Sequence, residues 1–280
     1  MGVRLVLWGD DVLSSQSFFH KFSENPKYLK QGLNLILEEL VQKNLFPNEE
    51  IEIWKKYNDV GSIKNTDEVI KTLSVRLCQL KNGKVITREQ KLEAFYSLLK
   101  GLTLENVIRI SSSIDYNPGA REAIKMLGEE VIQTLYTDDP WPCVDYQIRE
   151  LGIISGKGAV PVLELPEGRR KEYNPSLLFR CDAKLTGEVK PLNKSQEFAK
   201  YLKRLGIDLK EVAAIDSPEN METLSRVQEA GGVAIGYPNK DEDIEKFSRN
   251  SIPVLKDRDL RGFAEIVLDP RESVIGRYCE

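Results

Sequence analysis

Polar side chains follow three segments with the apolar pattern of buried strands, at the points where those segments end. Asp10 and Asp11 follow the first segment, Thr137 follows the second, and Asp216 and Ser217 follow the third. Because the carboxyl ends of parallel strands border one crevice in an open α/β sheet, we expect these side chains to converge there. Carboxylates from two strands would form an oxygen-rich site suited to Mg²⁺, and a neighbouring hydroxyl could hold a phosphate oxygen.

Two further features favour an anion in that crevice. Ser217 and Pro218 begin a predicted helix, whose first backbone N–H groups and dipole suit a negative charge. Lys194, on the first turn of another predicted helix, would neutralise a phosphate charge. For each residue taken singly a structural role is the stronger alternative, because Asp and Ser at strand ends are common turn and capping residues. Their order along the chain is more specific than any one of them.

The elements that must position these residues alternate between strand and helix from residue 117 to the C-terminus. Short apolar runs predict strands at 3–8, 130–136, 211–215 and 233–236, with 252–255 as a candidate fifth strand. Helices are predicted between them, including 193–205, which Asn193 caps and Gly206 ends. This alternation predicts an α/β fold with a doubly wound parallel sheet.

The stretch between the first strand and residue 114 has a different pattern. Apolar residues recur there at helical spacing near 28–45, 65–77, 88–99 and 104–110. Since the first strand precedes this block, we interpret it as a helical insertion into the α/β domain. The predicted division is therefore an α/β core formed by 1–15 and 115–280, and a helical cap formed by 16–114.

Composition excludes several classes of protein. The chain has 280 residues, of which 41% are hydrophobic and 30% are charged, as in ordinary globular proteins. Its net charge of −4, with basic and acidic residues intermixed, gives no support for a nucleic-acid partner. No apolar run approaches the ~20 residues of a membrane helix, and the N-terminus lacks a signal-peptide pattern. We therefore expect a cytoplasmic protein without membrane or nucleic-acid partners.

Histidine and cysteine are too sparse for most hydrolase mechanisms. The chain has one histidine, His20, and four cysteines without a Cys-x-x-Cys pair. A structural zinc site and a histidine-dependent triad are therefore not expected. Carboxylates, hydroxyls, lysines and a hard metal are the groups left for chemistry. His20 begins the helical insertion, where it could face a ligand, although a core or surface role is the stronger alternative.

The order of these groups, together with the stretch from Leu205 to Gly236, resembles a known family. Their sequence order resembles that of the haloacid-dehalogenase (HAD) superfamily: first an acidic pair, then a helical insertion, Thr137, a lysine on a later helix, and finally Asp216-Ser217. The closest likeness is to its phosphoserine-phosphatase-type subfamily, on the segment AIDSPENM and the following EAGG. The resemblance implies a Rossmann-like core with an inserted cap.

The resemblance also implies roles for individual residues. Thr137 would supply the phosphate-binding hydroxyl, and Lys194 would be the motif lysine, with Lys190 as a weaker candidate. Asp216, together with Asp10, would bind Mg²⁺. The ligand would be a small phosphorylated metabolite or inorganic phosphate. A carboxylate nucleophile of this kind needs no imidazole, which agrees with the histidine-poor composition.

The first motif departs from the family pattern Asp-x-Asp-x-Thr/Val, in which the first Asp attacks phosphorus and the second transfers a proton. If Asp10 takes the second place, Trp8 stands at the first. Moving the alignment by one residue puts Gly9 there. Moving it by two makes Asp10 the attacking residue and leaves Val12 to transfer the proton. No register restores both aspartates.

The last motif is altered as well, because Ile215 stands where Gly is usual and Asn220 replaces the second Asp. We therefore predict a HAD-like phosphatase-family protein with a magnesium and phosphate pocket, whose hydrolysis of small phosphomonoesters is weak or lost. The alternative is an active Mg²⁺-dependent phosphomonoesterase that uses Asp10 as its nucleophile.

Overall fold

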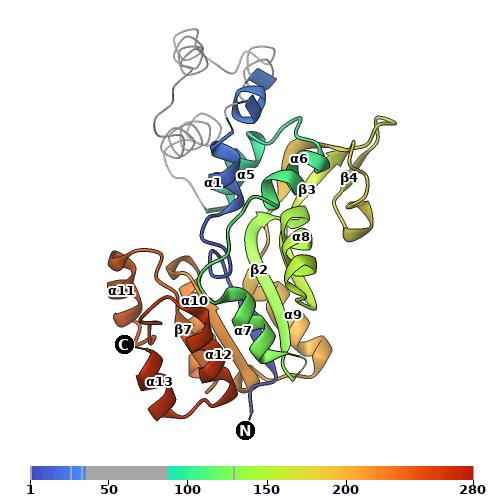
Figure 1. The fold of residues 1–280 in the computed structure, drawn as a ribbon. Helices are drawn as coiled ribbons and strands as arrows, with labels where there is room; N and C mark the ends of the chain where they lie inside the picture. Colours follow the sequence, from blue (N-terminus) through green and yellow to red (C-terminus); the bar gives the residue numbers. More distant parts are fainter. Residues whose placement is uncertain (1, 26, 33, 36–87, 129, 280) are drawn as a thin grey trace.

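The structure of the chain is a computed structural model. It describes residues 2–25, 27–32, 34–35, 88–128 and 130–279 (Figure 1). The helix expected at 65–77 lies outside these residues, and so does most of the helix expected at 28–45.

A parallel sheet forms the centre of the molecule, as the strand–helix alternation predicts. Its neighbouring strands are, in order, β3 (Ser155–Glu164), β2 (Ile132–Pro140), β1 (Leu5–Trp8), β6 (Val212–Asp216) and β7 (Val233–Gly236). β1 lies between β2 and β6, with Leu7 opposite Thr134 on one side and Ala214 on the other. The carboxyl ends of β1, β2 and β6 therefore lie next to one another.

Two strand predictions differ from the structure. Val254 and Leu255 make only isolated bridges, to Gly236 and Cys279, so 252–255 is not a strand. Pro253 within this segment has no N–H with which to continue a ladder. β2 runs past residue 136 to Pro140, where it pairs again with β3. Thr137 therefore lies within the strand and not after it.

An antiparallel extension continues the sheet beyond β2. The second half of β3 pairs with β4 (Arg170–Glu172) on one side and with β5 (Lys184–Lys190) on the other. Leu163 of β3 stands opposite Leu185 of β5, and both side chains are buried. This extension is the surface on which the helical insertion packs.

Helices cover both faces of the parallel sheet, which makes it doubly wound. One layer comprises α7 (Ala120–Leu127), α8 (Trp141–Leu151), α12 (Leu260–Leu268) and α13 (Glu272–Tyr278). The other comprises α9 (Lys194–Leu205), α10 (Met221–Glu229) and α11 (Asp241–Ser248). Because strand side chains alternate between faces, Val6 and Trp8 of β1 pack in the first layer and Leu5 and Leu7 in the second.

The described part of the insertion is helical. It contains α1 (Phe18–Ser23), α5 (Arg88–Ser97) and α6 (Leu104–Ser111), which Figure 1 shows grouped at one end of the sheet. These helices share an apolar cluster with Leu163 and Leu185 of the antiparallel extension. Backbone hydrogen bonds join the same parts, from Gly101 N to Leu185 O (2.8 Å) and from Leu104 N to Ala183 O (2.9 Å).

Across the part of the chain that the structure describes, no helix combines the length and the apolar character needed to cross a membrane.

Candidate functional site

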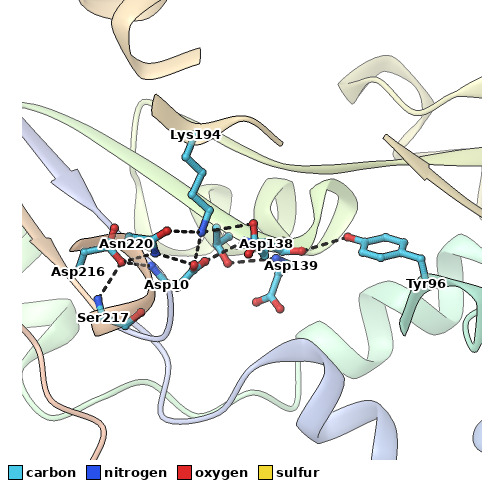
Figure 2. Close-up of polar contacts among 9 residues, drawn as sticks. Asp10, Tyr96, Asp138, Asp139, Lys194, Asp216, Ser217 and Asn220 are labelled. Carbon is cyan, nitrogen blue, oxygen red and sulfur yellow. Dashed lines mark hydrogen bonds and ion pairs between the residues drawn. The ribbon is translucent and has the colours of Figure 1, made fainter. Parts of the chain in front are cut away.

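Asp10 lies at the carboxyl end of β1, at the base of the site. Its Oδ1 atom accepts a hydrogen bond from the backbone N–H of Asp138 (2.8 Å), and its Oδ2 atom accepts one from Nδ2 of Asn220 (2.8 Å). Oδ2 also forms an ion pair with the ammonium group of Lys194. Figure 2 shows these side chains pointing toward one another. The Asp10 carboxylate is thus held by groups from three other segments of the chain.

Lys194 is the first residue of α9, and only 9% of its side chain is exposed. Asn193 caps this helix by accepting a hydrogen bond from Gln196 N (3.0 Å), so the lysine leaves the helix at a fixed point. Burial opposes the charged ammonium, but the negative charges of Asp10 and Asp138 outweigh it and raise the pKa of Lys194. Burial likewise opposes the Asp10 carboxylate, yet Lys194 lowers its pKa overall. The two side chains therefore form a buried ion pair.

Asp216 ends β6 beside Asp10. Its Oδ1 atom accepts hydrogen bonds from Asp10 N (3.0 Å), Ser217 N (2.8 Å) and Asn220 Nδ2 (2.8 Å). Burial, and then the nearby negative charge of Asp10, raise the pKa of Asp216 to about 7. Asp216 therefore anchors the turn after β1 as well as the turn after β6.

Thr137 is buried in β2, next to Asp138, whose N–H binds Asp10. Its Oγ1 atom accepts a hydrogen bond from Asp139 N (3.1 Å). The structure thus brings Asp10, Thr137, Lys194 and Asp216 to the same edge of the sheet. Lys190, the weaker lysine candidate, lies instead at the exposed last position of β5, with its ammonium 3.9 Å from a carboxylate oxygen of Glu172.

Trp8 does not reach this site. Its indole is fully buried in the layer below α12, where Nε1 donates to Oε1 of Gln133 (3.2 Å) and the ring lies edge-on to Phe263 at 5.2 Å. The alignment that gives Trp8 the nucleophile's place therefore puts that residue in the core, because side chains alternate along β1. The residues of the first motif that remain near the cleft are Gly9, Asp10 and Asp11.

Gly9 is the first residue after β1, and it has no side chain to offer the site. A Cβ atom added at Gly9 would lie 1.9 Å from Cγ of Asp216, so the Asp216 carboxylate already fills the space beside this position. Gly9 N donates to Ile215 O (2.9 Å), which holds its backbone against β6. Absence of a side chain at Gly9 is therefore a condition for the observed packing of Asp216.

A cleft of about 680 Å³ opens above these residues. The core contributes Asp10, Asp11, Thr137 and Ser217 to its wall, and the insertion contributes Phe19, His20, Leu92 and Phe95. His20, for which a core or surface role was the stronger expectation, thus faces the cleft. The Ser217 hydroxyl is buried without a hydrogen-bond partner among the described residues, so it is available to a ligand.

Asp11 is a further residue of the cleft wall, and its type and position in the sequence indicate no separate role. Its backbone is in the left-handed region, with φ of 54°, which few residues other than glycine adopt readily. This turn makes two consecutive carboxyl groups, those of Asp10 and Asp11, border the same cleft. Burial, followed by the charge of Asp10, raises the pKa of Asp11 to about 7. The left-handed conformation of Asp11 could not be predicted from the residue types in this segment.

Asp138 and Asp139 connect the site to the helical insertion. The Asp139 carboxylate accepts a hydrogen bond from the N–H of Phe18 (3.1 Å), the first residue of α1. The hydroxyl of Tyr96 in α5 donates to the backbone oxygen of Asp138 (3.3 Å), as Figure 2 shows. The sequence indicates acidic residues here but not these contacts, since they depend on how the insertion packs.

The side chains expected to bind Mg²⁺ do not fit that role in this arrangement. Both oxygens of Asp10 and Oδ1 of Asp216 already accept hydrogen bonds from N–H donors. Mg²⁺ requires a nearly octahedral shell of oxygen ligands, whereas the group nearest to both carboxylates is the NH₂ of Asn220. Among the residues described, no three or more His, Cys, Asp or Glu side chains are grouped so as to hold a metal ion.

Solved structures resemble the chain over most of its length. One is a phosphoserine phosphatase as a phospho-aspartyl intermediate analogue, with 19% identity, coverage of 93% of this chain and 97% of that one, and a TM-score of 0.57. A substrate-bound phosphoserine phosphatase complex has 19% identity, coverage of 93% and 96%, and a TM-score of 0.57. A HAD family hydrolase from Salmonella enterica serovar Typhi has 12% identity, coverage of 97% and 73%, and a TM-score of 0.58.

The chain has a HAD-like, Rossmann-like fold. No protein-family model and no curated protein sequence matches it. At identities below 20% the structural likeness establishes the fold, whereas activity has to be argued from the site itself.

Proposed function

We propose that the chain binds a small phosphorylated molecule, or inorganic phosphate, in the cleft above Asp10, and that it hydrolyses phosphomonoesters weakly or not at all. Thr137 and Ser217 offer buried hydroxyl groups at the cleft wall. Lys194 supplies a positive charge that compensates Asp10, which would otherwise repel the ligand. The helices of 16–114 act as a cap, in which Phe19, Phe95 and His20 contact the rest of the ligand.

The observation that carries the proposal of weak hydrolysis is Gly9. A covalent mechanism needs a carboxylate oxygen in line with phosphorus, and the first residue beyond β1 has no side chain. Restoring one there would bring its Cβ to within 1.9 Å of the Asp216 carboxyl carbon. The packing of Asp216 therefore requires glycine at position 9, and glycine has no side chain to attack phosphorus.

A second candidate function is hydrolysis with Asp10 as the nucleophile. It is favoured by the turn at Asp11, which sets both carboxyl groups at the same cleft. An Asp10 oxygen would form the bond to phosphorus while the bond to the ester oxygen breaks and that oxygen takes a proton from Asp11. Water would then hydrolyse the aspartyl phosphate, which releases phosphate and returns a proton to Asp11. Against this reading, both oxygens of Asp10 already accept hydrogen bonds, which reduces their reactivity.

Turnover and binding assays test the proposal together. Wild type, Asp10→Asn and the exposed control Asp182→Asn are assayed with phosphoserine, p-nitrophenyl phosphate and other small phosphate esters. Inorganic phosphate and phosphoserine are titrated in parallel by calorimetry. We expect saturable phosphate binding to wild type and to the control, and turnover in wild type no higher than in Asp10→Asn.

Two results would contradict the proposal. Robust turnover that Asp10→Asn abolishes, with a phosphoryl group trapped on Asp10, would establish the second candidate function. Absence of phosphate and phosphate-ester binding to wild type would exclude the proposed ligand class.

A further inference from the structure

Asn220 occupies a bridging position between the two carboxylates at the base of the site. It lies at the end of the 3-10 turn η3 (Pro218–Asn220), directly before α10, and is buried. Its Nδ2 atom is 2.8 Å from Oδ2 of Asp10 and 2.8 Å from Oδ1 of Asp216. A carboxamide has two N–H donors on one nitrogen, so each carboxylate receives one of them.

The orientation of this amide follows from its surroundings. The Lys194 ammonium, which also pairs with Asp10, lies 3.4 Å from Oδ1 of Asn220. Turning the amide over would place its oxygen against two carboxylate oxygens and its NH₂ against an ammonium group. Both changes are unfavourable, because they oppose like partial charges. The NH₂ group therefore faces Asp10 and Asp216.

Asn220 and Lys194 together supply what two adjacent buried carboxylates require. Buried charges must be paired and hydrogen-bonded to be tolerated. Lys194 neutralises Asp10 by an ion pair, and the Asn220 amide donates to both Asp10 and Asp216. A cation that bridged the two carboxylates would have to displace this amide, and it would leave the Asn220 donors unsatisfied in a buried site.

We propose that the Asn220 amide and the Lys194 ammonium take the place of a divalent cation between Asp10 and Asp216, so that the site binds its anionic ligand without a metal. This inference rests on the proposed function in one respect, namely that the anionic ligand is phosphate or a phosphorylated molecule. It assigns the loss of metal dependence to one substitution in the last motif, a carboxamide where a carboxylate would ligate a metal.

Titration with Mn²⁺ and Mg²⁺ tests the inference directly. Metal-stripped wild type, Asn220→Asp and the control Asn174→Asp are titrated with Mn²⁺ by electron paramagnetic resonance, with Mg²⁺ as competitor. Asn174 caps a 3-10 helix in the antiparallel extension, a role that Asp fills equally well. We expect no saturable binding at millimolar Mn²⁺ in wild type or control. In Asn220→Asp a third carboxylate joins the pair, so saturable Mn²⁺ binding should appear, with an affinity about tenfold or more above the upper limit measured for wild type.

Wild type alone decides the matter if Asn220→Asp fails to fold. Saturable Mn²⁺ binding to wild type that Mg²⁺ competes away, and that Asp216→Ala abolishes, would overturn the inference. Phosphate binding measured with EDTA and again with Mg²⁺ separates this inference from the proposed function. Equal binding supports both, and binding only with Mg²⁺ overturns the inference alone. No binding under either condition overturns the proposed function, and the Mn²⁺ titration still decides the inference.

Discussion

Lys194 and Asp10 form the most deeply buried ion pair among the residues described, with 9% and 12% of their side chains exposed. A buried pair is weak support for stability as such, because desolvating both groups offsets most of their attraction. Removing one partner has a larger effect, since it leaves the other charge buried and uncompensated. Asn220 and the N–H of Asp138 would then still donate to Asp10.

Replacing Lys194 with methionine should therefore destabilise the protein by about 3–5 kcal/mol. The double variant Lys194→Met/Asp10→Asn should recover most of that loss, because it buries two neutral groups in place of one unpaired charge. Urea unfolding of both variants and of Asp10→Asn completes the double-mutant cycle. A Lys194→Met protein as stable as wild type would show that Asp10 is not held by this contact.

At the scale of elements, α8 is joined to the antiparallel extension by a buried polar contact. The Tyr173 hydroxyl, just after β4, donates to Oδ2 of Asp145 in α8 at 2.6 Å. Both residues are buried, with exposed fractions of 2% and 3%. Burial raises the pKa of Asp145, and the hydrogen bond from Tyr173 opposes that rise. The contact therefore stabilises the ionised form of the carboxyl group.

Removing that hydroxyl in Tyr173→Phe should destabilise the fold in a pH-dependent way. Without its donor, the folded-state pKa of Asp145 rises further above the unfolded value, so ionisation opposes folding more strongly. At pH values above the folded-state pKa of Asp145 in both wild type and Tyr173→Phe, the variant should lose about 1.5–3 kcal/mol of unfolding free energy, the range for a hydrogen bond to a charged group. This loss of stability should shrink as the pH falls through these two pKa values, because Asp145 becomes protonated.

Unfolding of wild type and Tyr173→Phe between about pH 8 and pH 4 measures this difference. Asp145→Asn serves as the background control, because an amide does not titrate there and the effect of Tyr173→Phe should become independent of pH. A loss in the wild-type background that stays constant with pH would contradict the assigned contact.

At the scale of the whole molecule, the sequence predicts the parallel core well because its strands are short and buried on both faces. The strand predicted at 233–236 matches β7, and the alternation of apolar runs with capped helices predicts the doubly wound sheet. The end of β2 could not be predicted, since Thr137 to Pro140 are polar or helix-breaking residues that remain in the sheet through pairing with β3. Propensity gives no information on such pairing.

The sequence names four residues that the structure brings together, but their roles stay a prediction and their contacts could not be predicted. Asp10, Lys194 and Asp216 are candidates because of their places at strand ends and a helix start, whereas Thr137 is a candidate as a strand-end residue and lies within β2. The bridging amide of Asn220 and the left-handed turn at Asp11 depend on how β1 and β6 lie beside each other. The burial of Trp8 depends on the direction of one side chain, which the ambiguous first motif leaves open.

The division of the chain at residues 16 and 114 remains a prediction, and the packing indicates that the core would not fold without the insertion. The two ends of the insertion meet, because Ser15 N donates to Asp115 O (2.9 Å) and Ser14 bridges to Tyr116. A short Gly/Ser linker could therefore replace 16–114 without stretching the chain. The apolar cluster, however, is shared between both parts, with Leu98 and Leu104 of the insertion packed in the same cluster as Leu163 and Leu185 of the extension.

Excising 16–114 should thus expose a continuous apolar surface on the antiparallel extension. Such surfaces cause aggregation or loss of fixed packing in isolated domains. We expect the shortened protein to bind the dye ANS and to unfold in denaturant without a cooperative transition, whereas the full chain should unfold cooperatively. A shortened protein that unfolds cooperatively and binds no dye would instead show that the core is an independent domain. In that case the insertion would be attached to the extension without stabilising it. Its contribution to the site would then come from contacts such as those of Phe18 with Asp139 and of Tyr96 with Asp138.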